Sequence, residues 1–281
     1  MAKVAFTQQH VIITGGSSGI GRALANQLTQ LGAHVSIIAR RPALLEETVT
    51  ELESQRISPH QRLRSYSANV ADEQAIQEAI TALTADGYPP DILVTAAGFA
   101  RPGYVQELPL AIFRQTMDVD FFGTLHPIKA VLPTMIARRR GHIVTISSVA
   151  GFLPVFGYTA YGAAKFAVRG FSDVLRQEMM DYGIYVSVVF PPNTNTPGLA
   201  QENRYKPPET HRVEGATKAL SADQVARAIV RGIEKHQAYI LPTLETHLYF
   251  LLANGLTGVF RWYLSRIVTQ ARRESDLRSK V

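Results

Sequence analysis

The amino-acid sequence predicts an α/β fold: a doubly wound parallel sheet with helices on both faces. Three observations support this prediction. Short apolar runs alternate regularly with longer amphipathic segments, as in chains built from strand–helix–strand units. A glycine-rich turn, residues 14–21, joins the first apolar run to the first amphipathic segment. The 281 residues are 46% apolar and 19% charged, which is enough for a sizeable core and excludes disordered or collagen-like chains.

Strands and helices alternate strictly through the first half of the chain. Each predicted strand is a short, mostly apolar run, and each predicted helix has apolar residues spaced three or four apart. Arg62–Ala68 is the weakest of these strands because its alternation is only partial. The predicted strands are His10–Thr14, His34–Ala39, Arg62–Ala68 and Asp91–Thr95, and the helices between them are Gly19–Leu31, Ala43–Ser54 and Asp72–Thr84.

The second half continues the pattern with longer helices. Ser221 is a good N-cap for its helix, with Asp223 in the first turn. No internal repeat and no linker rich in Ser, Gly or Pro divides the chain, so we expect one domain over residues 1–245 and a helical extension over 246–281. The predicted helices are Leu110–Arg138, Tyr158–Asp181 and Ser221–Glu234, and the strands are His142–Ser147, Ile184–Phe190 and Ala238–Leu241.

The glycine-rich turn has the spacing G-x-x-x-G-x-G and lies between a strand and a helix. Residues without side chains let the backbone approach a pyrophosphate, and a helix N-terminus offers unpaired N–H groups and positive partial charge. A tight turn without a ligand is the alternative interpretation. The candidate cofactor contacts here are Gly15, Ser17, Ser18, Gly19, Ile20 and Gly21.

Two arginines, Arg40 and Arg41, end the second predicted strand. An NAD-binding fold of this type places a carboxylate near this position for the ribose hydroxyls. Arginine instead pairs with a 2′-phosphate through charge-assisted hydrogen bonds, and Arg22 would add positive charge to the same region. A solvated basic loop is the alternative. Combined with the glycine turn, the arginines favour NADP(H) as the cofactor.

Tyr161 and Lys165 share one face of a predicted helix because they are four residues apart. Tyrosine has an ordinary pKa near 10, and a neighbouring ammonium lowers it toward a value useful for proton transfer. Ser148, at the end of the preceding strand, offers a hydroxyl to orient a substrate oxygen. Strand alternation sends its neighbour Ser147 to the other face, so Ser147 ranks second.

These motifs, in this order, resemble the short-chain dehydrogenase/reductase family over almost the whole chain. The resemblance rests on the glycine turn, Thr95-Ala96-Ala97-Gly98 after the fourth strand, Ser148, Tyr161 with Lys165, and the segment from Pro191 to Thr196. It implies a Rossmann-type fold and an NADPH-dependent reductase that forms a homo-oligomer.

The resemblance also implies roles for individual residues. Tyr161 becomes the general acid, Lys165 the group that lowers its pKa, and Ser148 the hydroxyl that positions the carbonyl. Asp120 stands where the family usually has the Asn that completes a proton relay, and Thr95-Ala96-Ala97-Gly98 replaces Asn-Asn-Ala-Gly. The implied catalytic set is Ser148, Tyr161, Lys165 and Asp120, and the further cofactor contacts are Asn69, Val70, Gly98, Tyr161, Lys165 and Thr196.

Three segments point to a substrate class within the family. Residues 156–161, 190–198 and 202–210 are similar to those of reductases that act on the ketone of a long-chain lipid base in sphingolipid synthesis. A reductase of another acyl, steroid or retinoid carbonyl is the first alternative, and a non-catalytic NADP-binding scaffold is the second. Residues 193–221, rich in Pro, Thr and charge, are expected to form a substrate lid that is open or disordered without ligand.

Composition and charge argue against several other functions. The chain has 0 Cys, and its 8 His show no His-Glu-x-x-His spacing, so no metal site is predicted. The net charge is +6, of which +4 lies in residues 261–281, so no basic groove for nucleic acid is expected over the fold. No targeting peptide is visible at the N-terminus, and we expect a cytoplasmic protein.

The C-terminal extension carries an apolar stripe at helical spacing, followed by aromatic and basic residues. Its longest uncharged run, 246–260, has 15 residues, whereas a spanning helix needs about 20. We therefore expect peripheral contact with the cytoplasmic face of a membrane, with a helix packed on the domain or across a dimer interface as the alternative. The stripe consists of Leu248, Leu252, Leu256, Val259, Tyr263 and Ile267, with Trp262 beside it.

Overall fold

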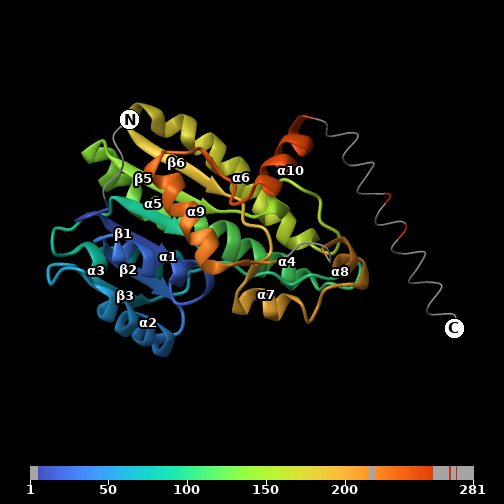
Figure 1. Ribbon diagram of the computed structural model, residues 1–281, viewed down its shortest axis with the longest axis horizontal. Coiled ribbons are helices and arrows are strands. Elements are labelled where there is room, and N and C mark those ends of the chain that lie inside the picture. The colour runs from blue at the N-terminus through green and yellow to red at the C-terminus, as the bar shows by residue number, and fades with distance from the viewer. Residues whose placement is uncertain (1–5, 215–218, 256–265, 267–269, 271–281) are drawn as a thin grey trace.

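Parallel strands form the central sheet of the protein, which a computed structural model describes for residues 6–214, 219–255, 266 and 270. Within these residues the order is β3-β2-β1-β4-β5-β6-β9, and every neighbouring pair is parallel (Figure 1). The strand order reverses between β1 and β4, which confirms the doubly wound prediction. The strands are β1 His10–Thr14, β2 His34–Ala39, β3 Leu63–Ser67, β4 Ile92–Thr95, β5 Gly141–Ile146, β6 Ile184–Val189 and β9 Tyr239–Ile240.

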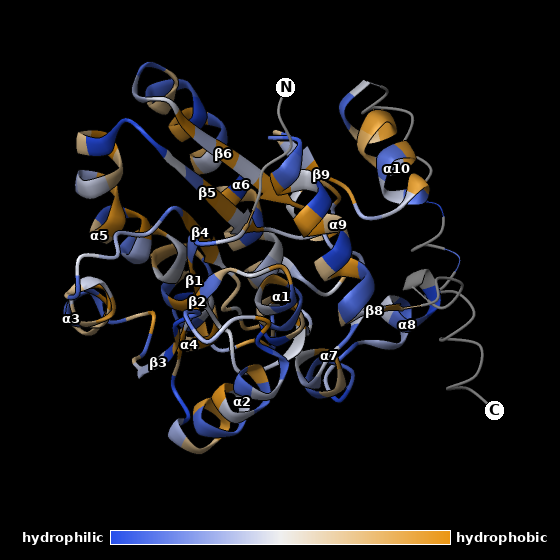
Figure 2. Cartoon of the chain, turned by 60° about the vertical axis from the view of Figure 1, so that its left-hand side comes forward, coloured by the Kyte–Doolittle hydropathy of each residue, from blue (hydrophilic) through white to orange (hydrophobic). Residues whose placement is uncertain are grey.

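Helices cover both faces of the sheet and enclose two separate cores. The pleat explains the separation, because Val11 and Ile13 of β1 join one core while Ile12, between them, joins the other. In Figure 2 the strands are largely orange, whereas the covering helices carry blue as well. One face carries α1 Gly19–Gln30, α2 Pro42–Gln55 and α9 Ala222–Glu234, and the other carries α3 Glu73–Thr84, α5 Gly123–Arg138 and α6 Thr159–Met179.

The long helix predicted over Leu110–Arg138 is not continuous. It consists of α4 Leu110–Thr116, a π-helical turn Met117–Phe122, and α5. A π turn keeps the backbone hydrogen-bonded while it accommodates one extra residue, so apolar spacing alone cannot reveal it. The turn matters for the site because it contains Asp120, whose side chain is fully buried.

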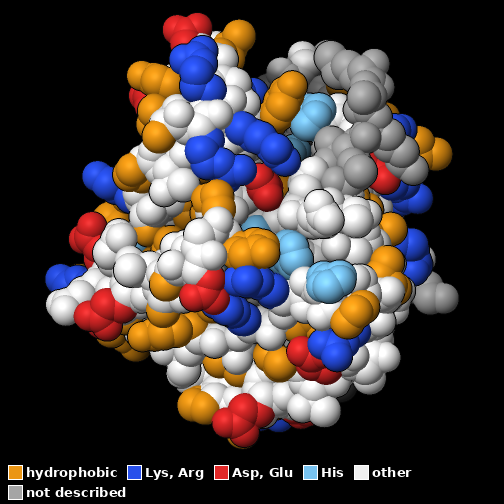
Figure 3. Space-filling model, turned by 90° about the vertical axis from the view of Figure 1, so that its left-hand side faces the viewer, with side chains coloured by type: hydrophobic (Ala, Val, Ile, Leu, Met, Phe, Trp, Pro, Cys, Tyr) orange, Lys and Arg blue, Asp and Glu red, His pale blue; other side chains and the backbone are white. Residues whose placement is uncertain are grey.

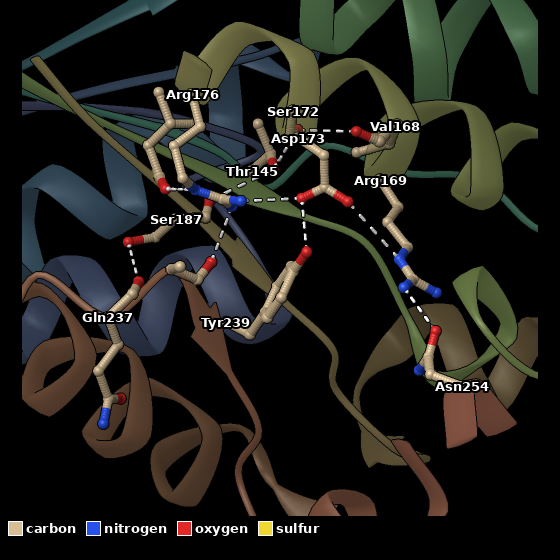
Figure 4. Close-up of polar contacts among 12 residues, drawn as sticks. Thr145, Val168, Arg169, Ser172, Asp173, Arg176, Ser187, Gln237, Tyr239 and Asn254 are labelled. Atoms are coloured by element: carbon tan, nitrogen blue, oxygen red, sulfur yellow. Dashed lines mark hydrogen bonds and ion pairs between the residues drawn. The ribbon is translucent and has the colours of Figure 1, made fainter. Parts of the chain in front are cut away.

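Polar contacts fasten the edge of the sheet that β6 and β9 form to α6 (Figure 4). Asp173 accepts hydrogen bonds from Arg176, at 2.9 Å, and from the Tyr239 hydroxyl of β9, also at 2.9 Å. One turn before Asp173 in α6, Arg169 donates to the Asn254 side chain of α10 Leu244–Gly255 at 2.8 Å. These contacts fix both β9 and α10 to the body of the protein.

The inner side of α10 packs on an aromatic cluster. The Phe250 ring centroid lies 5.1 Å from those of Phe152 and Tyr239 and 5.5 Å from that of Phe190. Its outer side leaves Leu244, Leu248 and Leu251 exposed at 88%, 54% and 68%. Of the predicted stripe, Leu248 is exposed and Leu252 half-buried, while the stripe residues from Leu256 onward lie outside the described residues, as does Trp262.

The amino ends of the strands carry histidines. His10 and His34 begin β1 and β2, His142 is the second residue of β5, and all three are buried. Figure 3 shows histidine side chains gathered among basic residues on one face of the molecule. His142 Nε2 lies 2.8 Å from Ser187 Oγ, whose own proton goes to the Gln237 carbonyl, so the ring donates. Burial lowers the pKa of His142 to about 3, and the ring is neutral in the folded protein.

Short elements complete the chain beyond β6. They are β7 Thr194–Asn195, α7 Pro197–Glu202, α8 Pro208–Glu214 and β8 Leu220–Ser221. Single 3₁₀ turns at Val149–Gly151 and Met180–Tyr182 precede β6. Strands β7 and β8 form a separate two-stranded parallel ladder. Among the helices that the structure describes, none combines the length and apolar character needed to span a bilayer.

Candidate functional site

The sequence-predicted site residues gather at the carboxyl ends of the strands. In Figure 1, α4, α7 and α8 lie at the same end of the molecule. In a parallel sheet with this order, the crevice beside the reversal between β1 and β4 is where ligands bind. The glycine turn follows β1, the Thr95–Gly98 segment follows β4, and Ser148 follows β5.

The glycine turn is fitted tightly against the segment after β4. Gly15 has φ +70°, and a Cβ on it would lie 2.7 Å from the Ala97 nitrogen. A Cβ on Gly21 would lie 2.4 Å from the Gly15 carbonyl oxygen. Both contacts are with backbone that cannot rotate away, so only glycine fits at these two positions. Gly19 faces Thr196, because a Cβ there would lie 3.0 Å from Thr196 Cγ2. The turn and the Thr196 segment therefore line the same site.

The N-terminus of α1 points its backbone N–H groups out of this turn. Ser18 is the N-cap residue but makes no capping hydrogen bond through its side chain. The first-turn N–H groups are therefore available to an anion, as phosphate binding at a helix start requires. Ser17 is buried in the turn. Ile20 instead packs against the core under α1 and α9, so its side chain serves the fold.

Three arginines near the turn have different surroundings. Arg40 and Arg41 follow β2 directly and are exposed. Arg22 is engaged on α2, where it pairs with Glu47 at 2.8 Å and with Glu51. Its charge is thus offset locally, which weakens the contribution that Arg22 would make to a phosphate-binding field. Arg40 and Arg41 remain the cations suited to a 2′-phosphate.

Asn69 and Val70 lie just beyond β3, the sheet neighbour of β2. Asn69 is exposed, and its side-chain oxygen accepts a 3.3 Å hydrogen bond from the Ala71 N–H, which shapes the turn. Val70 is buried, and its carbonyl accepts a hydrogen bond from His126 Nδ1 at 2.9 Å. Both positions lie beyond the carboxyl end of β3, as Arg40 lies beyond the carboxyl end of the neighbouring strand β2.

The catalytic candidates converge around a buried ion pair. Lys165 Nζ lies 2.9 Å from Asp120 Oδ1 and donates to the Ile146 carbonyl at 3.0 Å. The Lys165 and Asp120 side chains are 3% and 0% exposed, so water screens the pair little. Lys165 Nζ also lies 5.4 Å from the centroid of the Tyr161 ring. Ser148 makes a hydrogen bond with Tyr161. The four residues expected to act together are therefore in one cluster.

Asp120 also holds the segment after β4 in place. Its carboxylate accepts the Phe99 N–H at 3.2 Å, and a Cβ on Gly98 would lie 3.0 Å from Asp120 Oδ1. The carboxylate thus occupies space that a side chain at position 98 would fill. The π turn brings it within reach of both Gly98 and Lys165.

The electrostatics of Tyr161 differ from the sequence-based expectation. Burial raises the pKa of Tyr161 well above 10, and the negative charges of Asp120 and Glu202 raise it further, while the hydrogen bond with Ser148 lowers it. Lys165 was expected to lower this pKa, but its ammonium is paired with Asp120. Burial also raises the pKa of Asp120, against the opposing effect of Lys165. Tyr161 is therefore held strongly in its protonated, proton-donating form.

The two neighbouring serines have separate tasks. Ser147 is buried, and its hydroxyl donates to the Lys165 carbonyl at 2.9 Å, which fastens α6 to β5. Ser148 is half-buried and accepts the Ala150 N–H at 3.1 Å. Because Ser148 is the serine bonded to Tyr161, it has the position suited to a substrate oxygen.

Hydrogen bonds hold the segment expected to act as a lid over its described part. The Tyr158 hydroxyl donates to Glu202 Oε2 at 3.0 Å, and the Tyr104 hydroxyl donates to Glu209 Oε2 at 2.8 Å. Thr210 adds a 2.9 Å bond to the Phe156 carbonyl. An open or disordered segment in the absence of ligand stays a prediction, and residues 215–218 lie outside the described chain.

Glu202 and Tyr158 were not singled out as site residues from the sequence. The pair became visible only through the fold, because 44 residues separate the two side chains. The available signals were the 156–161 and 202–210 segments, which carry the resemblance but assign no individual role to Tyr158 or Glu202.

Comparisons with known proteins agree with this geometry. The short chain dehydrogenase family matches residues 9–207. The 3-ketodihydrosphingosine reductase of Bos taurus is 38% identical over 223 residues, which cover 79% of this chain and 67% of the relative. The enzyme of the same name from Dictyostelium discoideum is 38% identical over 266 residues, covering 90% and 80%.

A solved structure adds a spatial match. A 3-oxoacyl-[acyl-carrier protein] reductase of Brucella melitensis, with bound NAD, is 27% identical with a TM-score of 0.71, covering 85% of this chain and 88% of that one. The family match spans more than half of the chain and contains the glycine turn, Ser148, Tyr161 and Lys165. The chain belongs to the short chain dehydrogenase family.

Proposed function

We propose that this protein reduces the ketone of 3-ketodihydrosphingosine to the alcohol, with NADPH as the reductant. The observation that carries the proposal is the cluster of Ser148, Tyr161 and Lys165 at the carboxyl end of the sheet. The names and extent of the relatives support the substrate. This activity places the chain in sphingolipid synthesis.

The residues around the glycine turn fit a nicotinamide dinucleotide. The uncapped N-terminus of α1 suits the pyrophosphate, and the exposed Arg40 and Arg41 suit a 2′-phosphate. The Brucella melitensis reductase of similar fold binds NAD. We propose NADPH for this chain because of its two arginines. When bound, the cofactor supplies the hydride for the carbonyl carbon.

The chain's own residues supply the proton and the orientation. Ser148 donates a hydrogen bond to the ketone oxygen and holds it beside Tyr161. The Tyr161 hydroxyl gives its proton to that oxygen as the carbonyl carbon is reduced, so the product is a secondary alcohol. The high pKa of Tyr161 keeps its hydroxyl protonated over the neutral range. Lys165 and Asp120, paired behind the ring, fix the geometry.

NADPH oxidation in the presence of 3-ketodihydrosphingosine tests the proposal directly. Tyr161→Phe should reduce kcat by about 10²-fold or more, because positioned acid catalysis has that effect, and NADPH binding should remain. Turnover with an acyl, steroid or retinoid carbonyl but not with the sphingoid ketone would move the chain to a related reductase. NADPH binding without turnover of any ketone would favour the scaffold alternative.

We also propose the division of the chain into a reductase domain, 1–245, with its lid at about 193–221, and an extension, 246–281. Helix α10 supports a boundary near residue 245, since it begins at Leu244 and packs on the body through one side only. We further propose a homo-oligomer. Phe122, Phe166 and Val174 are 41%, 44% and 59% exposed and offer apolar contacts. Light scattering of the purified protein would test this.

The outer side of α10 supports peripheral contact with the cytoplasmic face of a membrane. Leu244, Leu248 and Leu251 project from α10 at helical spacing, and the sequence after residue 260 is basic. Replacing the three leucines with Glu should abolish flotation with anionic liposomes at low salt. Ile57→Glu, at an exposed residue after α2, is the matched control. Point changes are preferable to deleting 246–281, because deletion would remove Phe250 from the aromatic cluster.

A further inference from the structure

A small cavity lies at the amino ends of the strands, at the opposite end of the sheet from the catalytic candidates. It is lined by the starts of β4, β5 and β6 and by the end of α9, and its volume is about 210 Å³. Pockets that hold drug-sized molecules are larger, roughly 300–1,000 Å³. Figure 3 shows the face of the molecule on which histidine and basic side chains gather at these strand ends. The size of the cavity suits a small ion.

His236 lines this cavity with one ring nitrogen unused. Its backbone is left-handed, with φ +50°, a conformation that is uncommon for residues other than glycine. Its ring stacks on that of Tyr185, with the two centroids 3.7 Å apart. His236 Nδ1 is buried and has no hydrogen-bond partner among the described residues. Because buried polar atoms are nearly always satisfied by protein, water or a ligand, this nitrogen indicates an occupant of the cavity.

Arg140 brings to the same cavity a positive charge that is offset only in part. The carboxylate with which it pairs, Asp91, is 3.5 Å away. Asp91 is held more closely by Arg138, at 2.7 Å, and it also accepts the backbone N–H of His10 at 3.0 Å. The Arg140 side chain is 61% exposed, so its guanidinium can turn toward a second anionic partner.

The polar groups that remain available around the cavity are mainly hydrogen-bond donors. The side chains of Gln9 and Tyr185 line it, form no hydrogen bond with the described residues, and can each donate. Burial lowers the pKa of His236, so its ring is neutral near pH 7 and offers one N–H. Among the residues that the structure describes, no group of three or more ligating side chains could hold a metal ion. The charged residues in the lining or next to it in sequence carry a net charge of +1: Arg138, Arg139, Arg140, Lys235, Asp91, Asp181 and Glu234.

We propose that this cavity is a second binding site, for a small oxyanion of the phosphate type, held between the Arg140 guanidinium and the His236 ring. Arg140 supplies charge-assisted hydrogen bonds, and His236 Nδ1 supplies an N–H from the buried side. Gln9 and Tyr185 offer further donors. The site is separate from the reductase site proposed above, because the two lie at opposite ends of the same parallel strands. Its occupancy therefore does not depend on which ketone the enzyme reduces.

Titration with inorganic phosphate tests this site, at constant ionic strength maintained with sodium chloride. Arg40 and Arg41 would also attract phosphate, so every protein compared carries Arg40→Ala and Arg41→Ala. The Tm should rise with phosphate along a saturating curve, because a ligand that binds only the folded state stabilises it. The NMR signals of the His236 ring nitrogens should shift along the same curve. Arg140→Gln should raise the Kd for phosphate at least about tenfold, as expected for the loss of a charge-assisted hydrogen bond.

Arg139→Gln is the matched control, since Arg139 is the adjacent exposed arginine but donates to the Asp181 carbonyl and does not line the cavity. It should leave the Kd for phosphate nearly unchanged. A Tm that rises without saturation, and equally in all the proteins, would mean a general salt effect and overturn the site. An unchanged Kd in Arg140→Gln would do the same. Phosphate binding that depends on Arg140 but leaves the His236 signals in place would put the anion outside the cavity, and it too would overturn the inference.

Discussion

At the scale of single residues, Asp120 changes the chemistry expected of the site most. The sequence predicted that Lys165 would lower the pKa of Tyr161, but the ammonium lies 2.9 Å from the Asp120 carboxylate. The charges of Asp120 and Glu202 both raise the pKa of Tyr161, and the ammonium expected to lower it is engaged by Asp120. Such an environment keeps Tyr161 protonated, which is the form that reduction needs, although it also makes the hydroxyl a weaker acid.

Replacing this carboxylate should move the pH profile. Reduction needs a protonated Tyr161, so its rate falls as the pH rises through the tyrosine pKa. Asp120→Asn removes a charge that raises this pKa, and the alkaline limb of kcat should move toward lower pH. Profiles of kcat against pH for the parent and the variant measure the shift, and the same limb in both enzymes would show that Asp120 acts only on structure.

Arg40 decides cofactor preference in our proposal. Arg40→Ala should raise the KM for NADPH about tenfold, the effect of losing a charge-assisted hydrogen bond, and leave the KM for NADH nearly unchanged. Steady-state kinetics with both cofactors provide the measurement. Arg22→Ala is a useful comparison, since Arg22 is paired with Glu47 and Glu51 and should affect both cofactors alike. Equal losses with both cofactors in Arg40→Ala would assign Arg40 to the fold.

At the scale of elements, hydrogen bonds tie the segment from α7 to α8 to two other parts of the chain, Tyr104 and the stretch from Phe156 to Tyr158. As the lid that we propose, this segment would open these bonds to admit substrate. We expect amide protons of α8 to exchange more slowly once NADPH and substrate are bound. Hydrogen exchange followed by mass spectrometry would show this, with α3, on the far face, as the internal reference. Unchanged exchange in α8 would argue against a lid.

Most elements were predictable because apolar periodicity reports which face is buried. The strands β1, β2 and β5 and the helices α1, α3 and α9 lie within a few residues of their predicted bounds. The fold class and the positions of Ser148, Tyr161 and Lys165 follow from the same local patterns. The π turn, the Arg22 pairs and the Tyr158–Glu202 bond did not follow, because each depends on distances between residues far apart in the sequence.

At the scale of the whole molecule, the histidines at the amino ends of the strands should make stability fall in acid. The pKa of His142 is about 3 in the folded protein and near 6.5 when unfolded. Below pH 6.5 the unfolded chain binds a proton at His142 that the folded chain does not bind. The contribution of His142 to the unfolding free energy is therefore fully present above pH 6.5 and is lost as the pH falls toward 3. Between pH 7 and pH 5 this one group lowers the unfolding free energy by about 2 kcal/mol.

Urea titrations at the two pH values would measure this loss. His142→Gln keeps an amide donor for Ser187 but does not titrate, so the variant should lose less stability on acidification than the parent. His10, whose pKa burial also lowers, contributes in the same direction and remains in the variant. Equal losses in parent and variant would mean that His142 is not responsible.

The π turn has a consequence for how this protein tolerates insertions and deletions. Helix α5 is oriented by the packing of Ile128, Val131 and Met135, whereas Asp120 is oriented by Lys165 and Phe99. The extra residue of the turn lets both orientations coexist. Loss of any one residue between Met117 and Phe122 would rotate the residues before the deletion by about 100° around the helix axis relative to α5. Length in this stretch should therefore be under stronger selection than residue identity, with a single-codon deletion harming the enzyme more than most substitutions.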